Sequence, residues 1–484
     1  MLKTIFLTVG ILLWTVVETA AAVELGHPFT SGAVLQRGVK VPVWGKASPG
    51  ETVTVSFNGQ RHEVSAGAEG FWRADLDPME ASAVPQTLTA SGSGGTSAAA
   101  DDVLVGEVWF AGGQSNMDFR LVGASARGHA RLGAARAQFI RRPSVRIAMA
   151  TSTGRLVWRH AVPEEMLKPR AVGAIAYFFG CDLNEALGVP VGVMQAAVGG
   201  TTIEPWIADA GWAAVPQLEK RALGDNPKPI QLPGALFKRL IAPNVPYAVK
   251  GAIWYQGCSN AARAQNYRFK MKALLEGFAS AFGNPGLPIR FVQIAPYRGR
   301  TPEMHLNTLS LQLEQAAFAA MEPRAKMAVI ADTDQYEDIH PEEKAEVALK
   351  LTLLALRHDY GLDVKADAPE AVAATVANGR VAVKFANADR LYLYSRKKDM
   401  SADFEVADAS GAWHAAKIVN LVVSKNRFGK PDRTGDFAGN IVELEAEGVA
   451  DPKRVRYLGN EPHFSPLRNE AGLCAGPFDI VVDR

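Results

Sequence analysis

The chain has 484 residues, so two or three folded units are expected, since a typical domain has about 100–200 residues. Hydrophobic residues make up 48% of the chain and charged residues 21%, which is ordinary for a soluble globular protein. A net charge of +2 without any basic run argues against nucleic acid or an anionic membrane as partner and favours a neutral or weakly charged substrate.

Residues 1–22 have the layout of a secretory signal peptide. Lys3 supplies a positive charge, Ile5 to Val17 are almost all apolar, and Ala20 to Ala22 offer small residues for cleavage. No later stretch reaches the ~20 apolar residues that a spanning helix needs. We therefore expect cleavage and export to the periplasm or the extracellular space, without membrane attachment afterwards. An uncleaved membrane anchor is the alternative.

Residues 23–100 read as short strands separated by turns. Segments 41–45, 52–57 and 70–74 are rich in β-forming residues, with Pro-Gly, Asn-Gly and Glu-Gly pairs between them. This pattern predicts an N-terminal β-sandwich. Alternating apolar and polar residues return in the last part of the chain, 366–484, and predict a C-terminal β-sandwich.

Residues 101–365 alternate between strand-like and helix-like segments. The apolar runs typical of buried strands are 103–110, 189–197, 249–255, 289–294 and 327–331. The helix-like segments are 171–187, 263–282, 305–321 and 341–360. This alternation predicts an α/β domain, a parallel sheet with helices on both faces. In such folds ligands bind beyond the carboxyl ends of the strands.

Four motifs follow these predicted strands. In Ala111-Gly-Gly-Gln-Ser-Asn-Met117, a sharp turn after the strand can expose the Ser115 hydroxyl and its backbone N–H, although Ser115 would serve equally well as a helix cap. Gly199 and Gly200 can expose backbone N–H groups, or form a plain turn. The Gln256 amide can reach the same oxyanion site. Trp206 can present a face to a sugar, or belong to the core.

The fourth motif contains His340. A catalytic imidazole needs an acceptor at Nδ1 that leaves Nε2 facing the nucleophile, and Asp338 and Glu337 are the local candidates. An acidic cluster with one histidine could instead bind a metal, but no second histidine is nearby. Cys181, Cys258 and Cys474 are widely spaced and odd in number, so three buried thiols are expected rather than a disulfide framework or zinc cluster.

Taken together, these motifs closely resemble those of the sialate O-acetylesterase-like carbohydrate esterases of the SGNH-hydrolase superfamily. The matching blocks are Gly113-Gln-Ser-Asn-Met117, Gly199-Gly-Thr-Thr-Ile-Glu-Pro-Trp206, Trp254-Tyr-Gln-Gly257 with Ser259-Asn-Ala261, and Asp338-Ile-His-Pro341. Flanking similarities extend the resemblance over essentially the whole mature chain. It implies an SGNH-type catalytic domain at 101–365 and a serine esterase that uses an acyl-enzyme and no metal or other cofactor.

The resemblance also assigns roles. Ser115 is the expected nucleophile and His340 its base, with the oxyanion held by the Ser115 N–H, a backbone N–H of Gly199 or Gly200, and the Gln256 side chain. The substrate is expected to be an acetylated carbohydrate, sialic acid or a plant-type glycan, and to be contacted by three further side chains. These are Asn116, Trp206 and Asn260.

One position departs from the family pattern. Many relatives have glutamate where this chain has Cys258, and that glutamate is a candidate partner for the histidine. A neutral thiol is a weak acceptor, so either Asp338 or Glu337 must orient His340, and Asp338 is favoured because the motif matches through it. Two rival hypotheses follow: a carbohydrate-binding homologue with impaired catalysis, and an acyltransferase that uses Cys258 as nucleophile.

Overall fold

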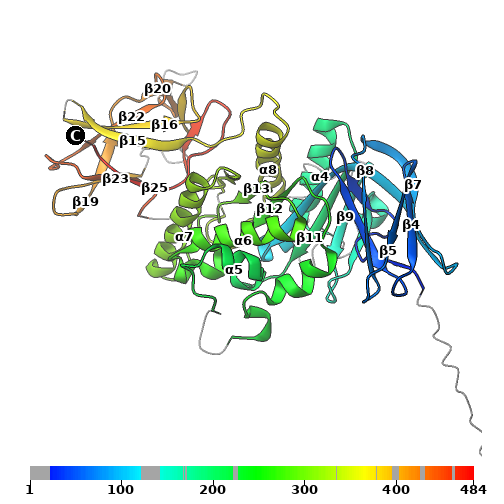
Figure 1. Cartoon of the computed structure of the whole chain (residues 1–484). Coiled ribbons are helices and arrows are strands. Elements are labelled where there is room, and N and C mark those ends of the chain that lie inside the picture. Colours follow the sequence, from blue (N-terminus) through cyan, green and yellow to red (C-terminus); the bar gives the residue numbers. More distant parts are fainter. Residues whose placement is uncertain are drawn as a thin grey trace, which may run out of the picture.

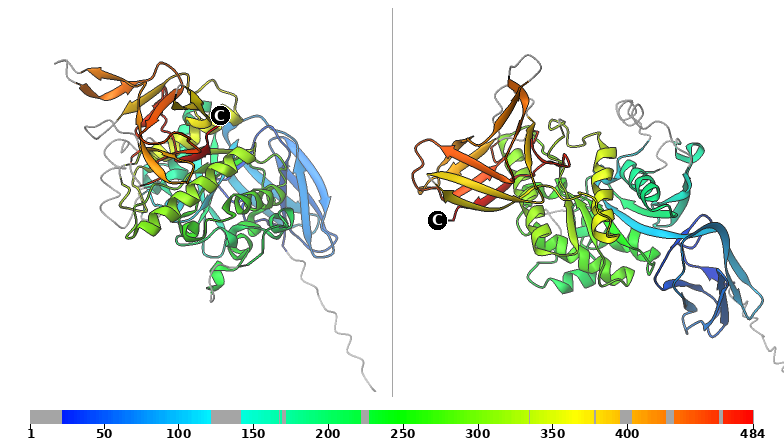
Figure 2. Two further views of the ribbon diagram at one scale, coloured as in Figure 1. Left: turned by 90° about the vertical axis from the view of Figure 1, so that its left-hand side faces the viewer. Right: turned by 90° about the horizontal axis from the view of Figure 1, so that it is seen from above.

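The computed structural model describes residues 22–121, 142–166, 168, 172–221, 227–333, 335–377, 379–394, 403–425, 431–460 and 464–483. The predicted signal peptide lies outside these ranges except for Ala22. Three regions follow one another in space: an N-terminal β region, a central α/β core and a C-terminal β region (Figures 1 and 2). No helix in the described ranges is long and apolar enough to cross a membrane.

The central core is built on a mixed sheet with the strand order β10-β9-β11-β8-β12-β13-β14. All neighbours pair in parallel except β10, which is antiparallel to β9 at the edge. The strands are β8 (Ser97–Gly113), β9 (Arg142–Ala150), β10 (Leu156–Ala161), β11 (Val191–Ala197), β12 (Gly251–Tyr255), β13 (Ile289–Val292) and β14 (Ala325–Ala328). The prediction of an α/β core is thus confirmed, as a mixed α/β fold around a large mixed sheet.

Strands β9 and β10 were not predicted. Arg146 interrupts the apolar run of β9, and in the structure it is buried and pairs with Asp102 at 3.1 Å. A buried charged residue of this kind looks like a solvent-exposed position in the sequence, because only the fold supplies its carboxylate partner.

Helices cover both faces of the central sheet, as two adjacent residues of β8 show. Trp109 packs against Phe179 of α4 (Ala174–Leu187), and its indole donates to the hydroxyl of Tyr360, next to the end of α8 (Lys344–Asp359). Phe110 points to the other face and packs against Phe278 of α6 (Tyr267–Phe282). Successive side chains of a strand alternate between faces, so α4 and α8 cover one face and α6 the other. Beside α6 lie α5 (Asp209–Ala214) and α7 (Pro302–Met321) (Figure 1).

The N-terminal region is continuous with the core through β8. The first part of β8 pairs with β7 (Ser82–Gly92), and the part from Glu107 to Gly113 pairs with β11. The expected domain boundary at residues 100 and 101 therefore falls inside one strand. The other strands of this region are β1 (Glu24–Leu25), β2 (Val34–Gln36), β3 (Val41–Lys46), β4 (Thr52–Phe57), β5 (Gln60–Ser65) and β6 (Phe71–Leu76). Its apolar side chains belong to the same hydrophobic core as those of the central sheet.

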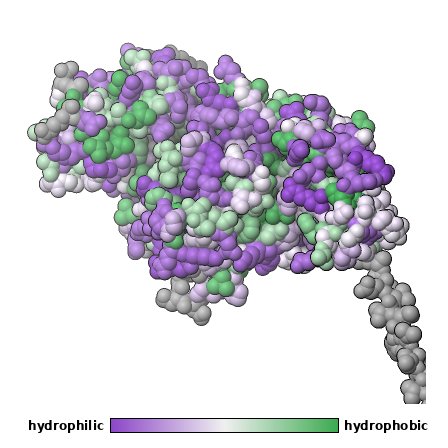
Figure 3. Space-filling model, in the orientation of Figure 1, coloured by the Kyte–Doolittle hydropathy of each residue, from purple (hydrophilic) through white to green (hydrophobic). Residues whose placement is uncertain are grey.

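The C-terminal region has a hydrophobic core of its own, which Val329 and Ala331 join from the central domain. A seven-stranded sheet contains β15 (Glu370–Ala377), β16 (Arg380–Ala386), β22 (Ile441–Ala446), β19 (Trp413–Ile418), β18 (Phe404–Ala407), β23 (Arg454–Tyr457) and β25 (Phe478–Val481). A four-stranded sheet contains β20 (Val422–Lys425), β21 (Pro431–Asp436), β17 (Leu391–Tyr394) and β24 (Leu467–Asn469). On the face that Figure 3 shows, polar and apolar residues are interspersed over all three regions.

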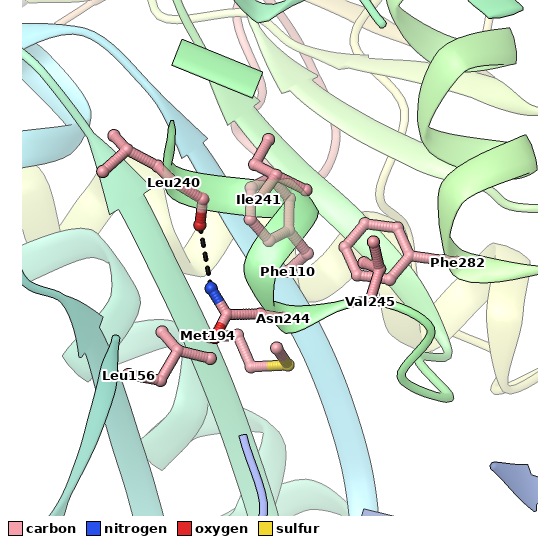
Figure 4. A pocket seen from close by; sticks show the side chains of 8 residues that line it. All are labelled: Phe110, Leu156, Met194, Leu240, Ile241, Asn244, Val245 and Phe282. Carbon is pink, nitrogen blue, oxygen red and sulfur yellow. Dashed lines mark hydrogen bonds between the residues drawn. The ribbon is translucent and has the colours of Figure 1, made fainter. Parts of the chain in front are cut away.

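A small cavity, lined mostly by apolar side chains, lies against the central sheet (Figure 4). One side chain in it is polar: Asn244 donates from Nδ2 to the carbonyl of Leu240 at 3.0 Å. The lining residues are Phe110, Leu156, Met194, Leu240, Ile241, Asn244, Val245 and Phe282. None of them was a predicted site residue, so this cavity lies apart from the candidate site.

Candidate active site

Two glycines at the end of β8 make room for the turn that carries Ser115. A Cβ atom on Gly113, whose φ is +147°, would lie 2.2 Å from the carbonyl oxygen of Tyr255. On Gly112 a Cβ atom would lie 2.7 Å from the ring of Phe110. Only glycine fits at such close approaches. Strand β8 can therefore end tightly between β11 and β12, and the short helix α1 (Ser115–Asp118) begins at the carboxyl edge of the sheet.

The structure brings Ser115 and His340 together. The Ser115 hydroxyl lies 2.8 Å from Nε2 of His340, within hydrogen-bond distance. His340 belongs to the segment between β14 and α8, 225 residues away in the chain. Ser115 is partly exposed and the His340 side chain is 40% exposed, so a ligand can reach both. This pair has the geometry of a nucleophile with its general base.

The two candidate acids lie at different distances from the imidazole. Asp338 accepts a hydrogen bond from the backbone N–H of His340 at 2.8 Å, and its Oδ1 is 3.9 Å from Nδ1 of the ring. That distance allows electrostatic attraction but is too long for a hydrogen bond. Glu337 is exposed and pairs with Arg298 at 3.0 Å. Asp338 is thus the acid beside His340, and Glu337 is directed to another partner.

The surroundings favour a neutral imidazole. Burial lowers the pKa of His340 below its ordinary value, the nearby Lys344 ammonium lowers it further, and Asp338 acts in the opposite direction. A general base must be unprotonated to accept a proton. The lowered pKa therefore favours the form of His340 that a general base requires.

The glycine pair after β11 lies beside the serine. A Cβ atom on Gly199 would be 3.5 Å from Cβ of Ser115, which places the Gly199 backbone against Ser115. Gly200 adopts a positive φ of 71°, and its carbonyl accepts a hydrogen bond from Gln231. The loop is thus folded so that the backbone of Gly199, one of the two predicted oxyanion glycines, passes close to Ser115.

Gln256 does not have a free amide to offer. Its Nε2 donates to the carbonyl of Thr201 at 3.2 Å and to Oδ1 of Asn260 at 2.8 Å, and its Oε1 accepts from the Tyr267 hydroxyl at 2.6 Å. Both amide hydrogens are therefore used inside the protein. In this arrangement Gln256 is bonded to the residue that follows the Gly199–Gly200 pair, and its predicted role as an oxyanion donor stays a prediction.

The three predicted substrate-contacting side chains are all buried. Asn260 accepts from the backbone N–H of Ile203 and donates to Glu204. Trp206, 0% exposed, packs edge-on against Trp254 and donates to Thr201. Asn116, 1% exposed, donates to the carbonyl of Ile339. The structure does not place any of these side chains where a sugar could touch it, and all three instead fix loops around the site.

Comparison with known proteins identifies the family of this chain. Residues 105–355, just over half of the chain, match the family model described as "Carbohydrate esterase, sialic acid-specific acetylesterase". The solved structure of a carbohydrate acetylesterase from Xanthomonas citri has a TM-score of 0.79 and 30% identity, covering 95% of this chain and 99% of that one.

The chain belongs to this family of carbohydrate esterases. It is a carbohydrate O-acetylesterase. Sialate O-acetylesterase from Mus musculus is 27% identical over 76% of this chain and 81% of its own length. The enzyme of the same name from Homo sapiens is 26% identical over 73% and 74%, respectively.

Several buried polar residues of the esterase site were missed in the sequence. Gln114 accepts from the N–H of Gly257, and Gln195 bridges the N–H of Gly173 and the carbonyl of Met117. Lys344, 0% exposed, donates to Oδ1 of Asn116 at 2.7 Å and to the carbonyl of Pro341. Gln114 lies inside the serine motif and was a visible candidate. The sequence did not indicate that Lys344 is buried, because a lysine near a helix start is usually solvated.

Cys258 of the esterase lies close to the site but does not resemble a nucleophile. It is partly buried at the start of the turn η5 (Cys258–Arg263), and its Sγ is 3.9 Å from Nδ2 of Asn116. Burial raises the pKa of the thiol to about 11, and Lys344 and Asn116 only partly offset this effect. At neutral pH the thiolate, the reactive form, is therefore scarce. Among the described residues no three His, Cys, Asp or Glu side chains cluster as metal ligands would.

Proposed function

We propose that this esterase is exported and uses a serine mechanism to remove O-acetyl groups from carbohydrate, either sialic acid or a plant-type glycan. The observation that carries the proposal is the 2.8 Å contact between the Ser115 hydroxyl and Nε2 of His340 at the carboxyl edge of the sheet. Export rests on the signal-peptide pattern of residues 1–22. The family name of the mammalian relatives supports sialic acid as one candidate substrate.

The reaction proceeds in two halves. His340 accepts the Ser115 proton while the oxygen attacks the acetyl carbonyl, and the oxyanion is held by the backbone N–H groups of Ser115 and Gly199. Collapse of the tetrahedral intermediate transfers the proton from His340 to the sugar oxygen, which leaves as the alcohol. His340 then deprotonates a water molecule, which attacks the acetyl-enzyme. Collapse of this second intermediate releases acetate as His340 returns the proton to the Ser115 oxygen. The Asp338 carboxylate stabilises the imidazolium formed in both halves.

Labelling and turnover together test this proposal. A fluorophosphonate probe should label the wild type at Ser115, and the variant Ser115→Ala should neither be labelled nor release acetate from an aryl acetate or an acetylated glycan. A panel of O-acetylated sialic acid, xylan, xyloglucan and pectin then ranks substrates by kcat/KM. A folded Ser115→Ala variant with wild-type turnover would falsify the serine mechanism.

The same assay separates the rival hypotheses. A carbohydrate-binding homologue without catalysis would bind acetylated glycan but resist the probe. An acyltransferase dependent on Cys258 would lose activity in Cys258→Ala, whereas the serine mechanism predicts that this variant keeps its turnover within about threefold. The raised pKa of the thiol favours the serine mechanism over the second rival.

A further inference from the structure

A buried lysine connects the two catalytic segments. The Lys344 ammonium donates to Oδ1 of Asn116, which directly follows Ser115, and to the carbonyl of Pro341, which directly follows His340. Asn116 in turn donates from Nδ2 to the carbonyl of Ile339, which directly precedes His340, at 2.9 Å. The backbone on both sides of the histidine is therefore bonded to a two-residue unit formed by Lys344 and Asn116.

The environment of this ammonium is unusual for a lysine. It is completely buried, and it lies 4.8 Å from the ring centroid of Phe119 and 5.8 Å from that of Tyr255. The hydrogen-bond acceptors recorded for it are neutral, an amide oxygen and a backbone carbonyl. Burying a charge in this way is costly, so packing alone would be served better by an apolar side chain.

We propose that Lys344 is a positioning residue of the esterase, whose side chain holds the His340 segment against the Ser115 helix and, when protonated, supplies a positive charge near the imidazole. The proposal rests on the proposed serine mechanism. Without the ammonium, the Pro341 carbonyl and the Asn116 amide oxygen lose their shared donor. The two catalytic segments are then joined by the Asn116–Ile339 bond and by the Ser115–His340 contact itself. Misplacement of a catalytic group by about 1 Å can cost about a hundredfold in rate.

The positive charge of Lys344 also affects the pKa of His340. The Lys344 ammonium lowers the pKa of His340, and burial lowers the pKa of Lys344 itself to about 7. The groups that act on Lys344 are Cys258 from the η5 turn and Glu343, Asp338 and Glu342 from its own segment, all of which raise its pKa. In the pH range where His340 titrates, below its ordinary value, Lys344 is mostly protonated. Its charge therefore extends the active range of the base toward acidic pH.

The test compares three variants by the pH dependence of kcat/KM with an aryl acetate. Lys344→Met removes charge and donors but keeps an unbranched chain, and should lower kcat about tenfold to a hundredfold. Its KM should change less than kcat, and its acidic limb should move to higher pH. Lys344→Arg retains the charge, so its acidic limb should stay close to that of the wild type.

Lys350→Met is the matched control, because this lysine lies on the same helix, is partly buried, and donates to the Val329 carbonyl and to Asp332. It should keep wild-type kcat and pH profile. Equal loss of activity in both methionine variants, or an unshifted acidic limb in a folded Lys344→Met, would overturn the proposal. Should Lys344→Met fail to fold, Asn116→Ala is measured in its place. A lower kcat with an unchanged acidic limb of the kcat/KM profile supports the proposal. An unchanged kcat overturns it.

Failure of the serine mechanism would be seen separately. In that case the fluorophosphonate probe would not label Ser115 in the wild type, whatever Lys344→Met does. A labelled wild type with an unaffected Lys344→Met variant would leave the mechanism standing and remove the role of Lys344 alone.

Discussion

The two sides of His340 are built differently. On the buried side, Lys344 and Asn116 bond the backbone before and after the histidine and are almost inaccessible to solvent. On the exposed side, Asp338 is 63% exposed and its carboxylate stays 3.9 Å from the ring. Hydrogen bonds in a buried site persist, whereas exposed charge pairs are weakened by water and salt. The buried side therefore fixes the position of the base, and the exposed side mainly adjusts its charge.

The largest effect is expected from loss of the base itself. His340→Gln removes the group that takes the serine proton, and should lower kcat by about a thousandfold or more, as removal of a general base does in serine hydrolases. The fall in kcat is measured as the rate of acetate release at pH 7. Because both sides act through His340, adding Lys344→Met or Asp338→Asn to this variant should cause little further loss. A strong further loss would show that these residues act independently of the base.

On the buried side, Asn116→Ala removes both the acceptor of Lys344 and the donor to Ile339. We expect kcat to fall about tenfold to a hundredfold, because the serine segment loses its bonds to Ile339 and to Lys344 and the base is held less firmly. Combined with Lys344→Met, the loss should be smaller than the product of the single losses, since both belong to one hydrogen-bond unit. Losses that multiply would mean that the two residues are not coupled.

On the exposed side, Asp338→Asn keeps an oxygen for the His340 backbone N–H but removes the charge. We expect a fall in kcat of about tenfold, less than for Asn116→Ala. Asp338 raises the pKa of His340, so its neutralisation should move the acidic limb of kcat/KM to lower pH, opposite to the shift expected for Lys344→Met. A thousandfold loss would show that the carboxylate bonds directly to Nδ1 during turnover.

The smallest effect belongs to Glu337. Its carboxylate is exposed and pairs with Arg298 at 3.0 Å. Glu337→Gln should keep kcat and the pH profile of kcat/KM within about twofold, since exposed ion pairs contribute little. A loss as large as that of Asp338→Asn would transfer the role of the acid to Glu337.

The strands of the central sheet also differ in how well the sequence predicted them. The apolar runs of β8, β11 and β12 are buried on both faces, and this made them visible in the sequence. Strand β9 was not predicted, because Arg146 interrupts its apolar run. The boundary expected after residue 100 falls inside β8, because one strand serves the N-terminal region and the core with a single hydrophobic cluster.

By itself, the sequence determined those features of the site that lie within short, continuous motifs. Glycines that permit a tight strand end, the serine behind them and the Asp338-Ile-His-Pro341 motif are all short segments, and each can be read without knowing the partner. Tertiary structure decided which side chains face the ligand and which face the protein. Trp206, Asn260 and Gln256 looked like contacts for substrate or oxyanion, but each is buried and contacts a residue of another segment. These partners are Trp254, Ile203 and Thr201, respectively.

Lys344 is the opposite case, a residue of the site that the sequence did not indicate. Its sequence neighbours describe an ordinary solvated lysine at a helix start, and nothing local predicts a buried ammonium between Asn116 and Pro341. Burial and hydrogen bonding depend on elements more than 200 residues apart, since Asn116 and Lys344 are separated by 228 positions. Only the packed fold supplies the partners that decide the charge and the position of such a group.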